Sequence, residues 1–300
     1  MSFGQQELSD LRAAAFSIAY RMLGSVAETE DIVQESLLRL HRARTSGVKI
    51  ASSAAYVGTI ATRLAIDHLR SARVRRESYV GTWLPEPVVE ETEPSAVRQL
   101  EMAESLSIAF LRILESLSPV ERAIFLLKEV FGYSYPEIAP IVEKSEENCR
   151  QIFARAKAHI EARKPRFEVS EEKHGDLVKR FVGACQSGDL SALMDLLAAD
   201  VTFYGDGGGK ATALLEPLSG PEPVARHLFR IFARAKEAGF RLRFVRANGQ
   251  HGAMIFDSQE RLVSVITFDI VAGTVRSIWS VLNPDKLAHL GRVSDLARIA

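Results

Sequence analysis

Apolar positions recur at helical spacing in two long stretches of the chain. The first covers residues 7–78, which contain little glycine or proline, and the second runs from about residue 97 to residue 163. Residues 79–97 interrupt the pattern with three prolines and four glutamates. Because apolar residues that repeat every three or four positions share one helix face, we predict two helical modules joined by an acidic linker.

A different pattern begins beyond a second linker at residues 164–174. Helices are predicted at about 175–187 and 189–197, and another at 221–237. Alternating runs predict strands near 200–205, 241–247, 253–257, 262–270 and 274–282. Short turns separate the last three runs, so we expect these strands to be antiparallel neighbours. Helices followed by strands predict an α+β domain at the C-terminal end.

The sharpest local motif is a predicted helix-turn-helix at Gly132–Ile160. Ser134 and Glu137 have the spacing of a capping box, and Ser145 is placed to cap a second, longer helix. The predicted inner face of that second helix consists of Cys149, Ile152, Phe153, Ala156 and Ile160. The opposite face consists of Glu147, Arg150, Gln151, Ala154, Arg155 and Lys157. One packed face and one face of hydrogen-bonding side chains are typical of a recognition helix in the major groove.

An ordinary helical hairpin with a solvated charged face is the alternative interpretation, because helix-turn-helix signatures are only moderately specific. Two residues fit the motif poorly. Pro140 lies inside the first helix, where it removes a backbone hydrogen bond. Glu143 stands in the connection, where glycine adopts a left-handed turn more easily. We expect these residues to tilt the hairpin without abolishing it.

A cluster of arginines ends the first helical stretch. Five arginines and a single acid, Asp67, lie between Arg63 and Arg76. Such a cluster can contact phosphates and release counterions, although cations also favour a helix C-terminus. We predict DNA contacts by Arg63, Arg70, Arg73, Arg75 and Arg76 of this cluster and by Glu147, Arg150, Gln151, Arg155 and Lys157 of the recognition helix.

Composition adds few constraints. The formal net charge is zero, so only local clusters argue for nucleic acid. The two cysteines, Cys149 and Cys185, give no metal-binding spacing and no disulfide framework. We find no targeting segment and no apolar run of the ~20 residues that a membrane span needs. We therefore expect a soluble cytoplasmic protein without metal or cofactor.

The helical motifs resemble the extracytoplasmic-function (ECF) sigma factors of bacterial RNA polymerase. "AETEDIVQESLLRLHR" is similar to their region-two helix that docks on the polymerase clamp, and "TIATRLAIDHLRSARVRR" to the segment that melts and reads the −10 element. "LSPVERAIFLLKEVFGYSYPEIAPIVEKSEENCRQIFARAK" is similar to region four, which reads the −35 element. The resemblance covers about residues 8–163, and Glu143 stands where the family usually has glycine. It implies that the polymerase is contacted by Asp31, Gln34, Glu35, Leu38 and Arg39.

The C-terminal part resembles the SnoaL-like α+β cone, a curved sheet with helices over an apolar pocket. The motifs "WLPEP", "DGGGK" and "NPDKL" are similar to those of the ECF subgroup that carries this extension. The resemblance implies regulatory contacts by Trp83, Leu84, Pro85, Glu86 and Pro87, by Asp206, Gly207, Gly208, Gly209 and Lys210, and by Asn283, Pro284, Asp285, Lys286 and Leu287.

We hypothesise that Trp83 and Leu84 pack on the C-terminal domain, which would clasp the linker and bias closed against open arrangements of the DNA-reading modules. The alternatives are a tryptophan that lies on its own helical neighbours, and glycine-rich and tail motifs that are simple surface turns.

The predicted architecture is multi-domain, with two all-α sigma domains and an α+β cone. We expect sigma region two at residues 1–80, the linker at 81–100, region four at 101–166 and the SnoaL-like domain at 175–290. The resemblance implies core RNA polymerase (clamp helices and flap) and the −10 and −35 promoter elements as partners. We expect a monomer with no membrane contact, and a pocket in the cone with room for a small-molecule effector.

Catalysis by the cone is the rival hypothesis, because some SnoaL-like folds use an acidic or histidine base in an apolar pocket. The candidates are Tyr204, Asp206, His251, Asp257 and Asp269. None of them forms a close sequence pair, and fold alone does not prove function. We therefore predict a non-enzymatic transcription factor. A ligand-sensing helix-turn-helix regulator that acts without polymerase is the second alternative.

Overall fold

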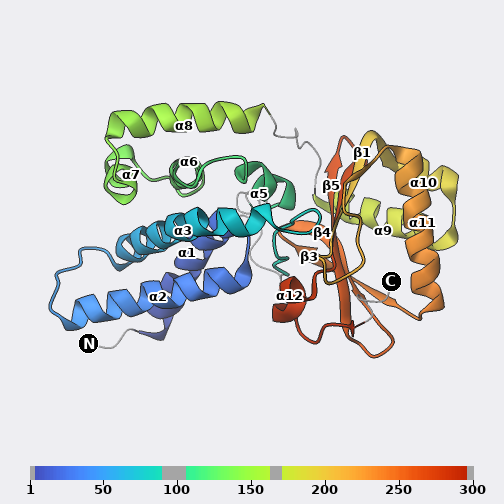
Figure 1. Cartoon of the computed structure of the whole chain (residues 1–300), viewed down its shortest axis with the longest axis horizontal. Coiled ribbons are helices and arrows are strands. Elements are labelled where there is room, and N and C mark those ends of the chain that lie inside the picture. Colours follow the sequence, from blue (N-terminus) through green and yellow to red (C-terminus); the bar gives the residue numbers. More distant parts are fainter. Residues whose placement is uncertain (1–3, 90–105, 163–170, 296–300) are drawn as a thin grey trace. The chain divides into compact units, whose positions relative to one another are not determined.

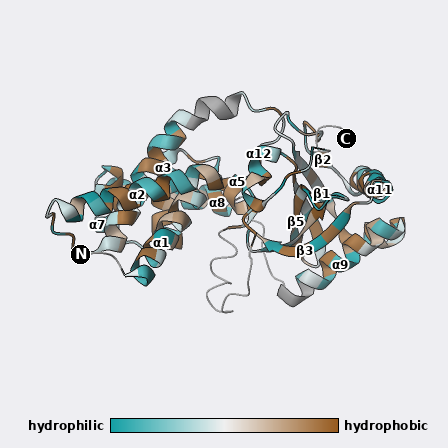
Figure 2. Ribbon diagram, turned by 90° about the horizontal axis from the view of Figure 1, so that it is seen from below, coloured by the Kyte–Doolittle hydropathy of each residue, from teal (hydrophilic) through white to brown (hydrophobic). Residues whose placement is uncertain are grey.

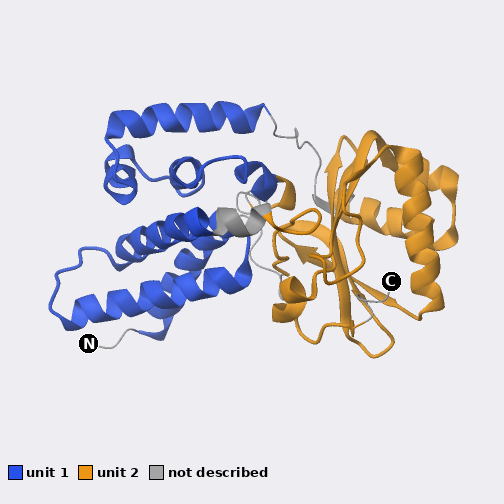
Figure 3. Ribbon diagram, in the orientation of Figure 1, with its two compact units in different colours: residues 1–77, 110–164 blue, residues 78–109, 165–300 orange. Residues whose placement is uncertain are grey.

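The computed structural model describes residues 4–89, 106–162 and 171–295, with the side chains of residues 72–77 and 171–173 left aside. The chain forms two compact units (Figure 3). The first unit joins Met1–Glu77 with Phe110–Lys164, and the second joins Ser78–Ala109 with Pro165–Ala300. The two predicted helical modules therefore share one unit. The predicted linker belongs to the same unit as the C-terminal domain rather than to a segment of its own.

Three helices form the first module of the first unit: α1 (Gln5–Leu23), α2 (Val26–Thr45) and α3 (Ser53–Glu77) (Figure 1). The change of direction after α1 is encoded locally. Gly24 adopts the left-handed conformation at φ 69° and donates its N–H to Tyr20 O, which a glycine does at little cost. Ser25 then caps α2 by accepting a hydrogen bond from Glu28 N. Figure 2 shows polar and apolar positions alternating around these helices, as expected when one face packs.

The second module follows the linker with α5 (Ile108–Leu114), α6 (Pro119–Phe125), a π-helical turn (Leu126–Val130), α7 (Tyr135–Val142) and α8 (Glu146–Glu161). The predicted helix-turn-helix is confirmed, and so are both of its caps. Ser134 and Glu137 form the capping box of α7, and Ser145 accepts from Asn148 N at the start of α8. Pro140 is accommodated inside α7. Glu143 takes the left-handed conformation, at φ 57°, that ends this helix.

The second unit is built on a six-stranded sheet of order β2-β1-β6-β5-β4-β3. Its strands are β1 (Leu197–Asp206), β2 (Leu218–Ser219), β3 (Arg241–Ala247), β4 (Gln250–Phe256), β5 (Leu262–Val271) and β6 (Thr274–Val281). The predicted antiparallel pairing of the last three strands is confirmed. Sequence reasoning missed the short β2 and the parallel pairing of β1 with β6, because a parallel partner lies far away along the chain.

The two faces of the sheet have different covers. Helices α9 (Glu171–Ser187), α10 (Leu190–Leu196) and α11 (Pro221–Glu237) lie together on one face, as Figure 1 shows, over an apolar core that includes Phe181 and Phe268. The described linker residues and the short α12 (Pro284–Leu287) cover the other face around Leu84 and Trp279. Strand β5 is buried along almost its whole length, because both faces of the sheet are covered.

No helix among the described residues is long and apolar enough to cross a membrane. Within the same residues, no group of three or more histidine, cysteine, aspartate or glutamate side chains is placed to hold a metal ion.

Candidate functional site

The outward face of α8 carries most of the side chains that this helix was predicted to direct toward DNA. Those exposed on this face are Glu147, Arg150, Gln151 and Arg155. The Arg150 guanidinium lies 4.9 Å from the centroid of the Tyr135 ring and 3.2 Å from Glu146 Oε2. Tyr135 begins α7, so this contact ties the outward face of α8 to the first helix of the motif. The opposite face is buried through Cys149, Ile152, Ala156 and Ile160.

Lys157 occupies a different position from the other predicted contacts of α8. It is half-buried, and its ammonium donates to Glu129 Oε1 at 3.0 Å. The hydrogen bond with Glu129 raises the pKa of Lys157 above its ordinary value. Lys157 therefore secures α8 to the π-helical turn in this arrangement.

The arginines of α3 are placed differently from one another. Arg70 is exposed and pairs with Asp67 at 3.2 Å. Arg63 donates to two backbone carbonyls at the end of α7, at 2.7 Å to Pro140 O and 3.1 Å to Ile141 O. The remaining predicted contacts, Arg73, Arg75 and Arg76, have side chains outside the described ones.

The predicted polymerase-binding residues share one stripe of α2. Asp31, Gln34, Leu38 and Arg39 are exposed and Glu35 is half-buried. Their spacing places them on a single helical face. Arg39 pairs with Glu35 at 2.6 Å, and Leu38 supplies an apolar side chain within the stripe. The opposite side of α2 packs into the bundle through Ile32, Val33 and Leu40.

Two buried arginines lie where the two helical modules meet. Arg122 of α6 donates to Met22 O at the end of α1, at 2.5 Å, and to Leu114 O at the end of α5, at 2.9 Å. Arg21 lies over the ring of Phe131 at 5.6 Å from its centroid. Burial lowers the pKa of Arg21 to about 10. Carbonyls at helix C-termini accept hydrogen bonds from cations favourably, so Arg122 links α6 to the ends of α1 and α5.

A close approach of backbone supports the same docking. A Cβ atom at Gly58 of α3 would lie 2.7 Å from the hydroxyl oxygen of Tyr133, which precedes α7. A larger residue at this position would require the Tyr133 side chain to shift. Sequence reasoning assigned no role to Gly58 or Arg122, because nothing in helical periodicity shows which helix ends will meet.

In the second unit, the "DGGGK" and "NPDKL" motifs meet the linker around one buried carboxylate. Asp206, fully buried at the end of β1, accepts from Tyr79 Oη at 2.5 Å, Leu84 N at 2.7 Å and Lys286 Nζ at 2.7 Å. Lys286 also donates to Leu84 O at 2.5 Å. Its ammonium lies 4.1 Å from the centroid of the Trp83 ring and 4.8 Å from that of Tyr79. We call Tyr79, Trp83, Leu84, Asp206 and Lys286 the clasp.

Hydrogen bonds from the linker stabilise the buried ion pair of the clasp. A buried ion pair needs further hydrogen bonds to offset desolvation, and the backbone of Leu84 supplies one to each partner. Burial, and after it the Asp206 carboxylate, raises the pKa of Tyr79 well above its ordinary value. The phenol therefore stays protonated and donates to Asp206.

The neighbouring motif residues shape the clasp. A Cβ atom at Gly208 would lie 2.2 Å from Asn283 Nδ2, so glycine is required where the two motifs touch. Asn283 itself donates to Tyr79 Oη at 2.9 Å. Lys210 and Asp285 form an exposed ion pair between the motifs.

The linker strip is buried to different degrees. Leu84 is fully buried and Pro85, Glu86 and Pro87 are buried, whereas Trp83 is only half-buried. Trp83 was expected to be buried with Leu84, but it forms the outer wall of the cation site around Lys286.

A second contact holds the linker at the β3–β4 turn. Asn248 N donates to Val88 O at 2.8 Å, and the Asn248 side chain accepts from Val88 N at 3.1 Å and donates to Leu106 O at 3.1 Å. Gln250 accepts from Ile108 N at 3.4 Å. The β3–β4 turn and the first residue of β4 therefore bind the chain on both sides of residues 90–105. The Asn-Gly pair of residues 248–249 predicts a hairpin turn, but it carries no sign of this second role.

Four of the five catalytic candidates make structural contacts in this arrangement, Asp206 within the clasp and Tyr204, Asp257 and Asp269 elsewhere in the second unit. The Tyr204 ring stacks on Trp279 with 4.2 Å between centroids. Asp269 accepts from Trp279 Nε1 at 2.9 Å and from Gln250 Nε2 at 2.5 Å. Burial raises the pKa of Asp269 to about 6. Asp257 lies elsewhere and binds Arg261 and Ser294.

Comparison with known families agrees with this arrangement. The chain matches the models for Sigma-70 region 2 at residues 9–75, Sigma-70 region 4 at residues 107–160 and a SnoaL-like domain at residues 178–279. The chain belongs to the ECF RNA polymerase sigma factors, in a form that carries a C-terminal SnoaL-like domain.

Two of the relatives are sigma factors of Mycobacterium tuberculosis. The chain is 36% identical to the ECF RNA polymerase sigma factor SigJ over 93% of this chain and 92% of the relative. It is 31% identical to the probable ECF sigma factor SigI over 62% of this chain and 64% of the relative. The crystal structure of SigJ superposes with a TM-score of 0.75 at 31% identity, covering 95% of this chain and 98% of that one.

The clasp predicts unequal effects for two aspartates of neighbouring ion pairs. Asp206→Ala leaves the Lys286 ammonium buried without its carboxylate and should lower the free energy of unfolding of the second unit by about 3–5 kcal/mol. Asp285→Ala removes only the exposed pair with Lys210 and should cost at most about 1 kcal/mol. Guanidinium denaturation followed by tryptophan fluorescence measures both, because Trp83 and Trp279 lie in this unit. Equal losses for the two variants would contradict the buried pair.

Asp269 predicts a pH dependence of stability. Its folded pKa of about 6 lies above the ~3.9 of an unfolded chain. Its stabilising contribution is therefore fully present below pH ~4 and lost as the pH rises to about 6. Relative to wild type, Asp269→Asn should gain about 2–3 kcal/mol of unfolding free energy between pH 4 and pH 7.

Asp257→Asn is the matched control for this measurement. Burial acts to raise the pKa of Asp257, but hydrogen bonds from Ser294, Gln259 and Arg261 outweigh it and lower the pKa to about 2. Its contribution changes only below pH ~4, so the difference from wild type should stay constant from pH 4 to pH 7. A constant difference for Asp269→Asn as well would show that this carboxyl has an ordinary pKa.

Proposed function

We propose that this chain binds core RNA polymerase and directs it to promoters with −10 and −35 elements, under control of its C-terminal domain. The observation that carries the proposal is the exposed, hydrogen-bonding face of α8, the second helix of a capped helix-turn-helix that ends the second module. Membership of the ECF family supplies the polymerase as the partner.

The proposal divides the surfaces of the first unit by task. The stripe on α2 that contains Leu38 would bind the polymerase. Arg150, Gln151 and Arg155 of α8 would contact bases and phosphates at the −35 element. Arg70 and the other arginines of α3 would contact the −10 element. Lys157 is assigned to holding α8 in place rather than to DNA, because it is bonded to Glu129.

Docking of the two modules limits DNA binding in the free protein. The donors of Arg63 that bond to Pro140 O and Ile141 O cannot bond to the −10 element at the same time. The buried Arg122 likewise ties α6 to α1. We infer that binding to polymerase separates the modules and frees Arg63, so that the protein binds promoters weakly until it has joined the core enzyme.

The C-terminal domain controls this separation through the linker. Tyr79 and Leu84 are fixed by the clasp, and Leu106 and Ile108 are fixed by the β3–β4 turn of the same sheet. Because Tyr79 and Ile108 are both bound to the same sheet, the sheet sets the distance between them. The chain leaves the first module just before Tyr79 and enters the second at Ile108. Release of either contact lengthens the available span, so the domain acts as a restraint on opening.

Transcription with purified components tests the sigma activity. Core RNA polymerase with this chain should produce transcripts from a pool of random-sequence DNA, and the selected templates should share two separated motifs. Arg155→Ala should reduce initiation on selected templates about tenfold by removing a contact to the −35 element. Arg226→Ala is the control, because Arg226 is likewise an exposed helical arginine but lies on α11 of the second unit, where it pairs with Glu222.

The same templates distinguish the proposal from a regulator that acts without polymerase. The chain alone should shift selected DNA only weakly in an electrophoretic assay, and the complex with core enzyme should bind tightly. Binding by the chain alone that equals binding by the complex, or a lack of transcripts above core enzyme, would overturn the sigma assignment.

Release of the linker tests the restraint. Asn248→Ala removes the side-chain hydrogen bonds to Val88 and Leu106 and should raise transcription severalfold at equal protein concentration. Trp83→Ala should act in the same direction, because it removes one wall around Lys286. Gln259→Ala, in the β4–β5 turn, is the control. Unchanged or lower transcription in both linker variants would contradict a restraining role.

A further inference from the structure

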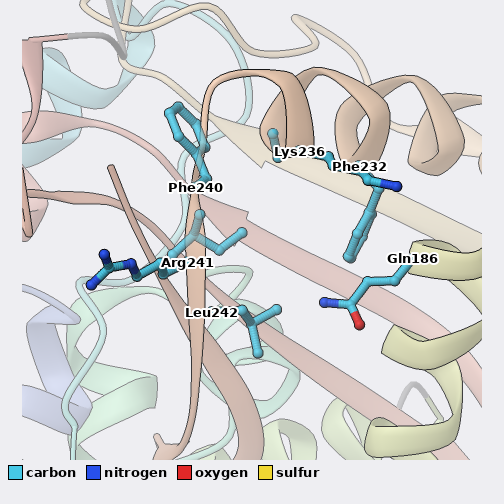
Figure 4. Close-up of a pocket in the computed structure, with 8 residues that line it drawn as sticks. Gln186, Phe232, Lys236, Phe240, Arg241 and Leu242 are labelled. Carbon is cyan, nitrogen blue, oxygen red and sulfur yellow. The ribbon is translucent and has the colours of Figure 1, made fainter. Parts of the chain in front are cut away.

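A cavity of about 310 Å³ opens on the helix-covered face of the sheet, on the side away from the linker. It lies between the end of α9, the last turns of α11 and the first residues of β3, as Figure 4 shows. The lining residues are Gln186, Phe232, Ala235, Lys236, Phe240, Arg241, Leu242 and Ile255.

Most of the wall is apolar and in reach of water. Phe232, Phe240 and Leu242 pack against the core of the domain but are only half-buried. Apolar surface that remains in water costs about 25 cal/mol per Å² relative to burial. A ligand that covers these three side chains would therefore gain binding free energy from the hydrophobic effect.

The polar groups of the cavity favour an anion. Arg241 is paired with Glu260 at 2.5 Å, so its charge is largely compensated. Lys236 has no ion-pair partner among the described residues. In Figure 4, the Gln186 amide and the Phe232 ring extend toward Leu242, whereas the Arg241 guanidinium extends away from them. Lys236 and Gln186 thus provide donors beside the apolar wall.

Lys236 is the one side chain of the lining that could act as an acid, base or nucleophile. None of its residues is an aspartate, glutamate, histidine, serine or cysteine. The buried Asp269 binds Trp279, which belongs to the cluster on the opposite face of the sheet. The apolar wall with one cation is suited to binding an amphipathic anion.

We propose that this cavity binds a small amphipathic carboxylate of the medium-chain fatty acid type. The apolar part lies against Phe232 and Leu242, and the carboxylate pairs with the Lys236 ammonium. The volume is at the lower end of the range for small-molecule sites, which selects a short ligand. The proposal does not depend on the sigma activity or on the restraint by the linker.

Isothermal titration calorimetry on the full chain tests it, with octanoate as the probe. Octanoate should bind at least severalfold more tightly than octylammonium, which has the same tail and the opposite charge. Ala235→Leu fills the cavity from α11 and should abolish octanoate binding. Ala233→Leu makes the same change at an exposed position of the same helix outside the cavity and should leave binding unaltered.

The cation is tested separately. Lys236→Gln should weaken octanoate binding roughly three- to fivefold, as expected for loss of a partly exposed ion pair, and should leave binding of 1-octanol unaltered. Lys179→Gln, an exposed lysine of α9 paired with Asp176, is the control and should bind octanoate like wild type. No octanoate binding at millimolar concentration, equal binding of octylammonium, or full binding by Ala235→Leu would overturn the proposal.

Discussion

The buried ion pair between Asp206 and Lys286 is the interaction on which the second unit depends. It lies where three segments distant in the sequence meet, namely the end of the first strand, the segment after the last strand and the linker between the sigma modules. Desolvation makes an isolated buried charge costly. The Leu84 backbone completes the hydrogen bonds of both partners, so linker binding and the buried ion pair stabilise each other.

The binding of the linker to the C-terminal domain bears on how the proposed sigma activity is regulated. A sigma factor must hold two DNA-reading modules at a distance that the promoter sets. Here Tyr79, Val88 and Leu106 are all bound to one sheet, Tyr79 through the clasp and the other two through Asn248. In the free protein, the side chains of Arg63 and Arg122 donate hydrogen bonds between the two helical modules. Under the proposed function, both sets of contacts favour a closed state, and binding to polymerase supplies the free energy that opens it.

The sequence predicted local and motif-based features well. The caps Ser134 and Ser145 and the antiparallel order of the last three strands follow from short-range chemistry, and the structure confirms them. The meeting of the "WLPEP", "DGGGK" and "NPDKL" motifs was expected from the resemblance, and the structure brings them together. Pairings set by tertiary packing were not predictable. The bonding of Arg63 to α7, of Lys157 to Glu129 and of Asn248 to the linker depends on which surfaces meet, and neither periodicity nor motif spacing contains that information.

Hydrogen exchange of the Leu84 amide tests the central claim most directly. This N–H donates to Asp206 in a buried site, so in the full chain it should exchange as slowly as amides in the middle of β5. In Asp206→Ala it should exchange orders of magnitude faster, while the amides of β5 remain protected relative to it. Rapid exchange of Leu84 in the wild-type chain, at the rate of an open linker, would show that the C-terminal domain does not hold the linker and would contradict the account.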